Sequence, residues 1–229
     1  MSSTILSTKV LSPSQKSLVI NAGLRLVEYN AITVRSLDFE LPKAHYDALI
    51  FTSQNAVKAY LEHLGKLPST IKEGLGGMKE VFCVGKKTKS FLEENGFHVM
   101  ASGQDAQELG KIISENHTGL HFLWPTGNQR RDELPRILNK EKIRFMEVTV
   151  YETVANPKKI NTSFDGILFF SPSAVLSFTK NNPISGTAFC IGTTTADSVK
   201  EYTKNYSIAT QPTVENVVVQ AVKRFKGND

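Results

Sequence analysis

The chain has 229 residues, enough for one large or two small domains that each bury a core. Hydrophobic residues make up 40% and charged residues 21%, as in ordinary globular proteins, and no apolar run approaches the roughly eighteen residues that cross a membrane. The first residues lack the basic and apolar regions of a secretion signal, so we expect a cytoplasmic protein. The net charge of +5 favours an anionic partner. Because the basic residues are scattered, a small polyanion fits at least as well as nucleic acid, which requires a basic stripe.

Apolar runs that predict strands alternate with amphipathic segments that predict helices. In the first half we expect strands at 4–8, 24–34, 48–51, 81–84 and 97–100, helices at 13–23, 54–64, 86–95 and 105–115, and a loop containing Gly74, Gly76 and Gly77. In the second half we expect strands at 121–124, 143–154, 167–170, 188–191 and 207–209, a turn at 125–128, and helices ending near 140, 180, 204 and 225. This alternation predicts parallel sheets with helices on both faces.

The chain repeats its own pattern. Asp47–Tyr60, DALIFTSQNAVKAY, returns as Asp165–Phe178, DGILFFSPSAVLSF, and Phe82–Thr88 returns as Phe189–Thr195. A period of roughly 110 residues is too long for a solenoid and predicts a duplicated α/β domain. The domain boundary stays open, because the long strands at 24–34 and 143–154 could each run from one domain into the other.

Five turns that follow strands are alike in carrying hydroxyl, amide or glycine residues. Such turns lie at the carboxyl ends of parallel strands, where free N–H groups of the next helix can bind an anion. Helix capping explains any one of them, whereas together they predict a site for carboxylates or phosphates. They are Thr52-Ser53-Gln54-Asn55, Gly85-Lys86-Lys87-Thr88, Thr126-Gly127-Asn128-Gln129, Ser171-Pro172-Ser173 and Gly192–Thr195.

The usual catalytic motifs are absent from the sequence. The five histidines form no metal-ligand pair, and there is no phosphate-binding loop, dinucleotide fingerprint or serine-nucleophile elbow, so we expect no metal and no cofactor. Cys83 and Cys190 lie in apolar runs and are predicted to be buried thiols rather than a disulfide. Tyr151 replaces the aliphatic Ile32 of the first repeat. Its phenol could pack in the sheet or donate a proton to a leaving group.

An ordered set of short motifs covers nearly the whole chain and resembles the uroporphyrinogen-III synthase family. The resemblance implies two similar parallel-sheet α/β domains, flavodoxin-like or Rossmann-like, joined by a two-stranded β-ladder. Residues 1–33 with 155–229 would form one domain, residues 36–149 the other, and residues 32–37 and 148–154 the ladder. The motifs are Ile50-Phe51-Thr52-Ser53 with Asn55-Ala56-Val57, Val84-Gly85 with Thr88, Pro125 with Gly127-Asn128 and Arg131, Val150-Tyr151 with Thr153, Phe170-Ser171-Pro172-Ser173, Ile191-Gly192 with Thr194-Thr195, and Pro212-Thr213.

The resemblance also implies a reaction: the cofactor-free cyclisation of hydroxymethylbilane to uroporphyrinogen III, with loss of water and inversion of ring D. The enzyme would be a monomeric lyase of heme biosynthesis that holds its substrate between the domains. Tyr151 matches the tyrosine that assists departure of the terminal hydroxyl, whereas Ser7-Thr8-Lys9 departs from the usual Thr-Arg-Pro. The alternative is a non-enzymatic two-domain binder of a small polyanion. The implied substrate-binding residues are Thr52, Ser53, Asn55, Thr88, Thr126, Gly127, Asn128, Arg131, Ser171, Ser173, Thr194 and Thr195.

Overall fold

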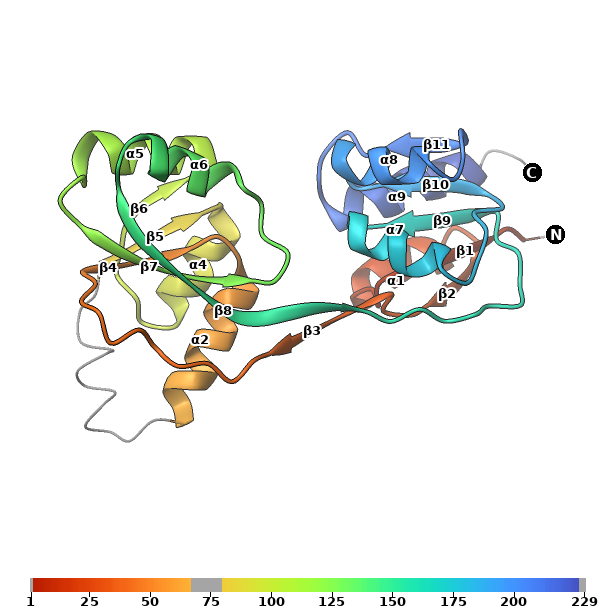
Figure 1. Ribbon diagram of the computed structural model, residues 1–229. Helices are drawn as coiled ribbons and strands as arrows, with labels where there is room; N and C mark the ends of the chain where they lie inside the picture. The colour runs from red at the N-terminus through yellow and green to blue at the C-terminus, as the bar shows by residue number, and fades with distance from the viewer. Residues whose placement is uncertain (1, 67–79, 227–229) are drawn as a thin grey trace. The chain divides into compact units, whose positions relative to one another are not determined.

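The computed structural model describes residues 2–66 and 80–226, so the expected loop with Gly74, Gly76 and Gly77 lies outside the described residues. The chain divides into two compact units (Figure 1). Unit 1 consists of Met1–Thr33 with Val154–Asp229, and unit 2 consists of Val34–Thr153. Unit 1 is therefore built from both ends of the chain, and unit 2 from its middle.

Unit 1 contains a five-stranded sheet in the order β11-β10-β9-β1-β2, and all of its neighbouring strands are parallel. Helices α1 and α9 pack together on one face of this sheet, and α7 and α8 pack together on the other. The strands are β1 (Thr4–Ser7), β2 (Arg25–Glu28), β9 (Gly166–Phe169), β10 (Thr187–Cys190) and β11 (Tyr206–Ile208); the helices are α1 (Pro13–Ile20), α7 (Pro172–Thr179), α8 (Thr193–Lys200) and α9 (Val214–Phe225).

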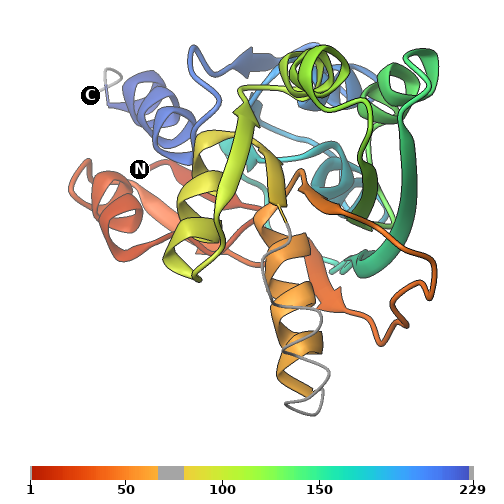
Figure 2. The same cartoon turned by 90° about the vertical axis from the view of Figure 1, so that its left-hand side faces the viewer.

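Unit 2 contains a six-stranded sheet in the order β3-β8-β7-β4-β5-β6, in which the pairs from β8 to β6 are parallel. Figures 1 and 2 show α5 and α6 on one face of this sheet and α2 and α4 on the other. The strands are β3 (Ile32–Ser36), β4 (Ala48–Phe51), β5 (Glu80–Val84), β6 (Val99–Gly103), β7 (His121–Gly127) and β8 (Arg144–Ala155); the helices are α2 (Gln54–Lys66), α4 (Lys86–Glu94), α5 (Ala106–Asn116) and α6 (Glu133–Lys140).

The two sheets have the same strand order when their strands are matched as the sequence repeats match them. The repeats given above equate β9 with β4 and β10 with β5, and a third repeat, of Leu24–Glu28 in Ile143–Glu147, equates β2 with β8. With β11 equated to β6 and β1 to β7, the order β11-β10-β9-β1-β2 becomes β6-β5-β4-β7-β8, which is the order of unit 2 without its edge strand β3. The predicted parallel α/β architecture is therefore confirmed, and the two units share one arrangement of strands.

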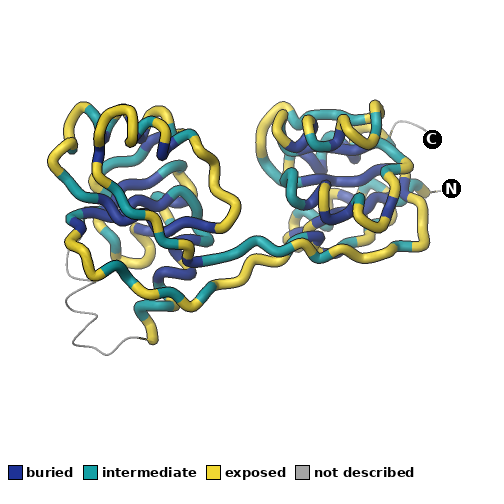
Figure 3. Tube along the Cα trace, viewed as in Figure 1, coloured by how far each residue is buried: buried dark blue, intermediate teal, exposed yellow. Residues whose placement is uncertain are grey.

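Both sheets are buried on both faces because their strands alternate between two hydrophobic cores. In β4, Leu49 and Phe51 pack under α2 and α4, whereas Ala48 and Ile50 pack under α5 and α6. Figure 3 shows this concentration of buried residues along the strands of each unit. Cys83 and Cys190 are buried free thiols, as expected, and burial raises their pKa values to about 11 and about 12.

An aspartate fixes the start of the central strand pair in each unit. The Asp47 carboxylate accepts a hydrogen bond from the His121 N–H (2.8 Å), and the Asp165 carboxylate accepts one from the Thr4 N–H (2.7 Å). The main-chain N–H groups of the same aspartates donate to the His121 and Thr4 carbonyls. Asp47 and Asp165 are equivalent in the repeat, so one carboxylate sets the register of β7 on β4 and the other that of β1 on β9.

Several expected boundaries were wrong. The strand expected over 24–34 is broken into β2 and β3, and between them the Tyr29 and Ala31 N–H groups donate to the Ser7 and Thr8 carbonyls. The turn expected at 125–128 is mostly strand, because Pro125, Thr126 and Gly127 pair with β8. Pro125 is tolerated there because the pairing of β7 with β4 ends at Leu123, so the missing N–H interrupts no ladder on that side.

Strand β6 also ends later than expected. It runs to Gly103, three residues beyond the strand expected at 97–100. At the edge of unit 2, β3 lies beside β8. The Leu37 N–H donates to the Val150 carbonyl and the Asn156 N–H donates to the Ala31 carbonyl. These two segments therefore run antiparallel.

Across residues 2–66 and 80–226, no helix combines the length and the apolar character needed to span a bilayer.

The Asp47 contact makes the stability of unit 2 pH-dependent. Hydrogen bonds from the His121 N–H and from His45 lower the pKa of Asp47 below its usual 3.8. The resulting stability is present above pH 3.8 and is lost as the pH falls through the lower pKa of the folded protein. We expect Asp47→Asn to weaken this acid dependence, measured as the thermal unfolding midpoint between about pH 6 and about pH 2. Asp197→Asn on α8 is the control, and an unchanged acid dependence in Asp47→Asn would contradict the assignment.

Candidate functional site

A cavity of about 390 Å³ opens in unit 2 at the carboxyl ends of β4, β5 and β7. From β4 the chain continues to β5 and β6 on one side of the sheet, whereas β7 and β8 lie on the other, so the strand order reverses between β4 and β7. Open α/β sheets bind ligands at this reversal, because the connecting helices leave a crevice there. The lining residues are Thr52, Ser53, Val84, Gln104, Asp105, Ala106, Trp124, Thr126, Gln129, Arg130, Arg131, Glu133, Leu134 and Tyr151.

Tyr151 reaches the cavity from β8 by lying over Gly127 of the neighbouring strand. The register between β7 and β8 shifts after Thr126, which pairs Gly127 with Tyr151. A Cβ atom on Gly127 would lie 2.4 Å from Tyr151 Cζ and 2.8 Å from its hydroxyl oxygen. Real Cβ atoms do not approach a ring so closely, so the position of the phenol requires glycine at 127. This is a packing requirement rather than a requirement for an unusual backbone conformation.

Asn128 holds the end of β7 against β8 beside the phenol. Its N–H donates to the Tyr151 carbonyl (3.2 Å), and its side-chain oxygen accepts from the Thr153 N–H (2.9 Å). Its side-chain nitrogen is 3.5 Å from the Thr153 carbonyl. Asn128 therefore fixes the backbone on both sides of residue 152, so the main-chain position of Tyr151 is fixed as well.

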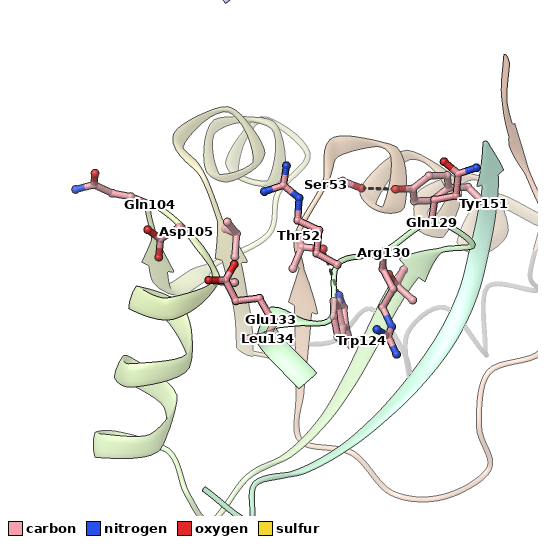
Figure 4. Close-up of a pocket in the computed structure, with 14 residues that line it drawn as sticks. Thr52, Ser53, Gln104, Asp105, Trp124, Gln129, Arg130, Glu133, Leu134 and Tyr151 are labelled. Carbon is pink, nitrogen blue, oxygen red and sulfur yellow. Dashed lines mark hydrogen bonds between the residues drawn. The ribbon is translucent and has the colours of Figure 1, made fainter. Parts of the chain in front are cut away.

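Ser53 links the phenol to the start of α2. Its hydroxyl oxygen accepts a hydrogen bond from the Ala56 N–H (3.1 Å), as an N-cap residue does. The same hydroxyl donates to the Tyr151 hydroxyl at 3.2 Å, which Figure 4 marks with a dashed line. The geometry thus brings two of the predicted site residues into direct contact.

The wall below the phenol is formed by Trp124, the only tryptophan in the sequence. Its side chain is 2% exposed, and its indole N–H lies 3.4 Å from the Thr52 hydroxyl oxygen. The Arg130 guanidinium lies over the indole ring, 5.7 Å from the centroid, a cation–π arrangement. Arg130 also donates to Glu147 and Asp132, and these two hydrogen-bonded carboxylates raise the pKa of its guanidinium.

Arg131 is the neighbouring cation, and it differs from Arg130 in its ion-pair partners. Within residues 2–66 and 80–226, Arg131 has no ion-pair partner, although its side chain lines the cavity. Asp105 lines the opposite part of the wall, but it caps α5 by accepting from the Glu108 N–H (2.9 Å). The charge of Arg130 is therefore neutralised within the protein, whereas that of Arg131 is available to a ligand.

The structure brings together some of the residues predicted from the sequence and separates others. Gly127 and Asn128 support Tyr151 rather than line the cavity, while Asn55 and Thr88 lie in α2 and α4 outside it. Those that line the cavity are Thr52, Ser53, Thr126, Arg131 and Tyr151. Those that belong to unit 1 are Ser171, which caps α7 by accepting from the Ala174 N–H, Ser173 in α7, and Thr194 and Thr195 in α8, together with Lys9 after β1.

Other lining residues were missed by the sequence reasoning. Gln104 and Asp105 follow β6, whose end we had placed too early, so the turn at which they lie was not recognised as a sixth turn of the same kind. Trp124 was read only as part of an apolar strand, although it stands at the carboxyl end of a predicted strand where lining residues are expected. The described residues contain no group of three or more His, Cys, Asp or Glu side chains arranged to hold a metal ion.

Comparisons with known proteins agree on one family. The model of the family described as uroporphyrinogen-III synthase HemD matches residues 15–218. The chain is 24% identical over 205 residues to a porphyrin biosynthesis protein HemD from Ruminiclostridium josui, covering 80% of this chain and 39% of that protein. It is 29% identical over 117 residues to a uroporphyrinogen-III synthase from Saccharomyces cerevisiae, covering 46% of this chain and 42% of that protein. Those matches span about two fifths of each relative's length.

Solved structures show the same fold. A uroporphyrinogen-III synthetase from Helicobacter pylori superposes with a TM-score of 0.75 at 20% identity, covering 98% of this chain and all of that one. A mutant uroporphyrinogen III synthase from Thermus thermophilus superposes with a TM-score of 0.66 at 15% identity, with full coverage of both chains. Because the family model extends over most of the sequence, this chain belongs to the uroporphyrinogen-III synthase HemD family.

Proposed function

We propose that this chain is a uroporphyrinogen-III synthase, a cytoplasmic lyase that acts as a monomer and needs no cofactor. It would cyclise hydroxymethylbilane to uroporphyrinogen III, with loss of water and inversion of ring D. Family membership supports this proposal. The observation that carries it in the structure is the cavity of unit 2, in which a phenol fixed by Gly127 and Ser53 faces the same space as Arg131, an arginine without an ion-pair partner among the described residues.

The proposed chemistry needs a proton donor and a site for carboxylates. Tyr151 would donate a proton to the terminal hydroxyl, because a phenol is a stronger acid than the serine and threonine hydroxyls beside it. The C–O bond then breaks and water leaves, while the adjacent pyrrole nitrogen supplies an electron pair to the methylene carbon. Ring D forms the closing C–C bond to that methylene carbon, and its earlier bond to the chain breaks and re-forms at its other α carbon, which inverts the ring. That α carbon loses its hydrogen and a proton is returned to Tyr151, so that only water is lost overall.

Binding would position the substrate through its carboxylates, which are the groups that an arginine binds best. Arg131 is suited to this role because no carboxylate of the described residues neutralises it. Most of the rate would come from holding a flexible tetrapyrrole in a ring-closing geometry, with the phenol as a modest acid. The formal charge of +5 on the chain favours the approach of such a polyanion.

The direct test is to supply the purified chain with freshly generated hydroxymethylbilane and to separate the oxidised products by isomer. We expect isomer III to predominate over the isomer I that forms spontaneously. A heat-denatured sample of the same protein is the control for spontaneous closure. If the folded chain yields only isomer I, the synthase proposal is wrong and a non-enzymatic binder of a small polyanion becomes the better interpretation.

The position of the phenol provides a second prediction. Tyr151→Phe should lower kcat about 10- to 100-fold without abolishing activity, because it removes the acid but leaves the positioning. Gly127→Ala should lower kcat at least as much, because its Cβ would occupy the space of the Tyr151 ring. Gly119→Ala is the matched control, since a Cβ there meets no atom within 4 Å. Wild-type turnover in Tyr151→Phe would remove Tyr151 from the mechanism.

The contrast between cavity and surface arginines provides a third prediction. Arg131→Gln should raise the KM for hydroxymethylbilane about 3- to 10-fold with little change in kcat, because it removes a carboxylate contact made before and during the reaction. Arg136→Gln on α6 is the control, as Arg136 is exposed and does not line the cavity. Equal effects of the two substitutions would show that general electrostatic attraction, rather than a contact in the cavity, governs binding.

A further inference from the structure

The hydroxyl groups of Ser53 and Tyr151 form a hydrogen-bonded pair in which Ser53 is the donor. The Ala56 N–H can only donate, and it donates to Ser53 Oγ at 3.1 Å. The Ser53 hydroxyl in turn donates to the Tyr151 hydroxyl oxygen at 3.2 Å. With Ser53 as the donor, the Tyr151 proton is the one that has no acceptor among the described residues.

The remaining proton is the one that can react. Tyr151 lines the cavity, and its ring is held over Gly127, so its hydroxyl cannot turn far from its present place. One lone pair of the phenol oxygen is occupied by the Ser53 proton. The phenol proton is therefore directed away from Ser53 and toward the cavity, where a ligand can accept it.

The second copy of the repeat shows that capping alone does not require this pair. Ser171 is the repeat equivalent of Ser53, and it caps α7 in the same way, with its oxygen accepting from the Ala174 N–H at 3.1 Å. The residue equivalent to Tyr151 is the aliphatic Ile32, which has no hydroxyl to receive a proton. The N-cap serine of unit 2 thus has a phenol as its partner, whereas the equivalent N-cap serine of unit 1 has none at the equivalent position.

We infer that Ser53 is a positioning residue: its hydroxyl, fixed by the Ala56 N–H, orients the Tyr151 hydroxyl so that the phenol proton points at the leaving group. This inference rests on the proposed function. It assigns no proton transfer to Ser53 itself, because the serine donates a hydrogen bond both before and after the phenol gives up its proton. Donation to the phenolate would also stabilise the charge that develops on Tyr151 during transfer.

The test compares Ser53→Ala, Ser53→Thr, Tyr151→Phe and the double variant Ser53→Ala/Tyr151→Phe in formation of isomer III. Ser53→Ala should lower kcat about 3- to 10-fold with KM within about 2-fold, the effect of losing one hydrogen bond made to the acid. Ser53→Thr keeps a hydroxyl that can cap α2 and should restore kcat to within about 2-fold. The double variant should be no slower than Tyr151→Phe alone, because Ser53 acts only through the phenol.

Loss of a helix cap is separated from loss of the orienting contact by Ser12→Ala. Ser12 caps α1 in unit 1 by accepting from the Gln15 N–H. This control therefore loses a comparable cap at a position distant from Ser53 in the sequence. It should leave kcat unchanged. If Ser12→Ala slowed the reaction as much as Ser53→Ala, or if Ser53→Ala slowed the Tyr151→Phe variant as much as it slowed wild type, the inference would be overturned. A raised KM with unchanged kcat in Ser53→Ala would also overturn it, in favour of simple substrate binding.

A measurement without substrate distinguishes this inference from the proposed function. In protein labelled with [13Cζ]tyrosine, the Tyr151 resonance is identified by its loss in Tyr151→Phe. Ser53→Ala should move that resonance, whereas Ser12→Ala should not, and an unmoved resonance would show that the pair does not exist in solution. If the resonance moves but wild type forms no excess of isomer III, the proposed function has failed and the catalytic role of Ser53 is rejected with it, although the hydrogen bond is real.

Discussion

The parallel pairing of β4 with β7 is the constraint on which unit 2 depends. Asp47 fixes its register by binding the first N–H of β7, and the apolar residues of both strands are buried on both faces. Since the chain leaves β4 toward β5 and later leaves β7 toward β8, the segments that follow diverge at the carboxyl ends of this pair. A polar cavity at that edge is a consequence of the strand order, and it is lined by Thr52, which follows β4, and by Thr126 near the end of β7.

In the candidate site, interactions that stabilise the fold also hold the side chain of Tyr151 in place. Ser53 satisfies an N–H at the start of α2, which any helix of this kind requires, and the same atom then positions a phenol. Gly127 belongs to a strand that is otherwise bulky, and its missing side chain gives the Tyr151 ring its place. The phenol is thus held by packing against Gly127 and by a hydrogen bond to its hydroxyl oxygen, which is the preorganisation that the proposed acid role requires.

Adjacent arginines with the same chemistry have different environments. Arg130 is engaged by Glu147, Asp132 and the face of Trp124, so it shapes the wall of the cavity. Arg131 has no carboxylate partner in the described part of the chain and can bind one from a ligand. This division matters for a polycarboxylate, because a neutralised arginine contributes little further attraction, whereas an unpaired one contributes both charge and a planar set of donors.

The sequence by itself determined the α/β class, the repeat, and most strands and helices, since apolar periodicity and capping residues are local properties. It also singled out Tyr151 as a candidate site residue through the mismatch with Ile32. Its resemblance to a family added Thr52, Ser53 and Arg131 as candidate substrate-binding residues. Only the tertiary structure decided that the segment 24–34 breaks near Tyr29, that Gln104 and Asp105 reach the cavity, and that Arg130 is paired while Arg131 has no ion-pair partner within residues 2–66 and 80–226. The physical reason is that these features depend on partners distant in the chain, such as Ser7 for Tyr29 and Glu147 for Arg130, which no local pattern specifies.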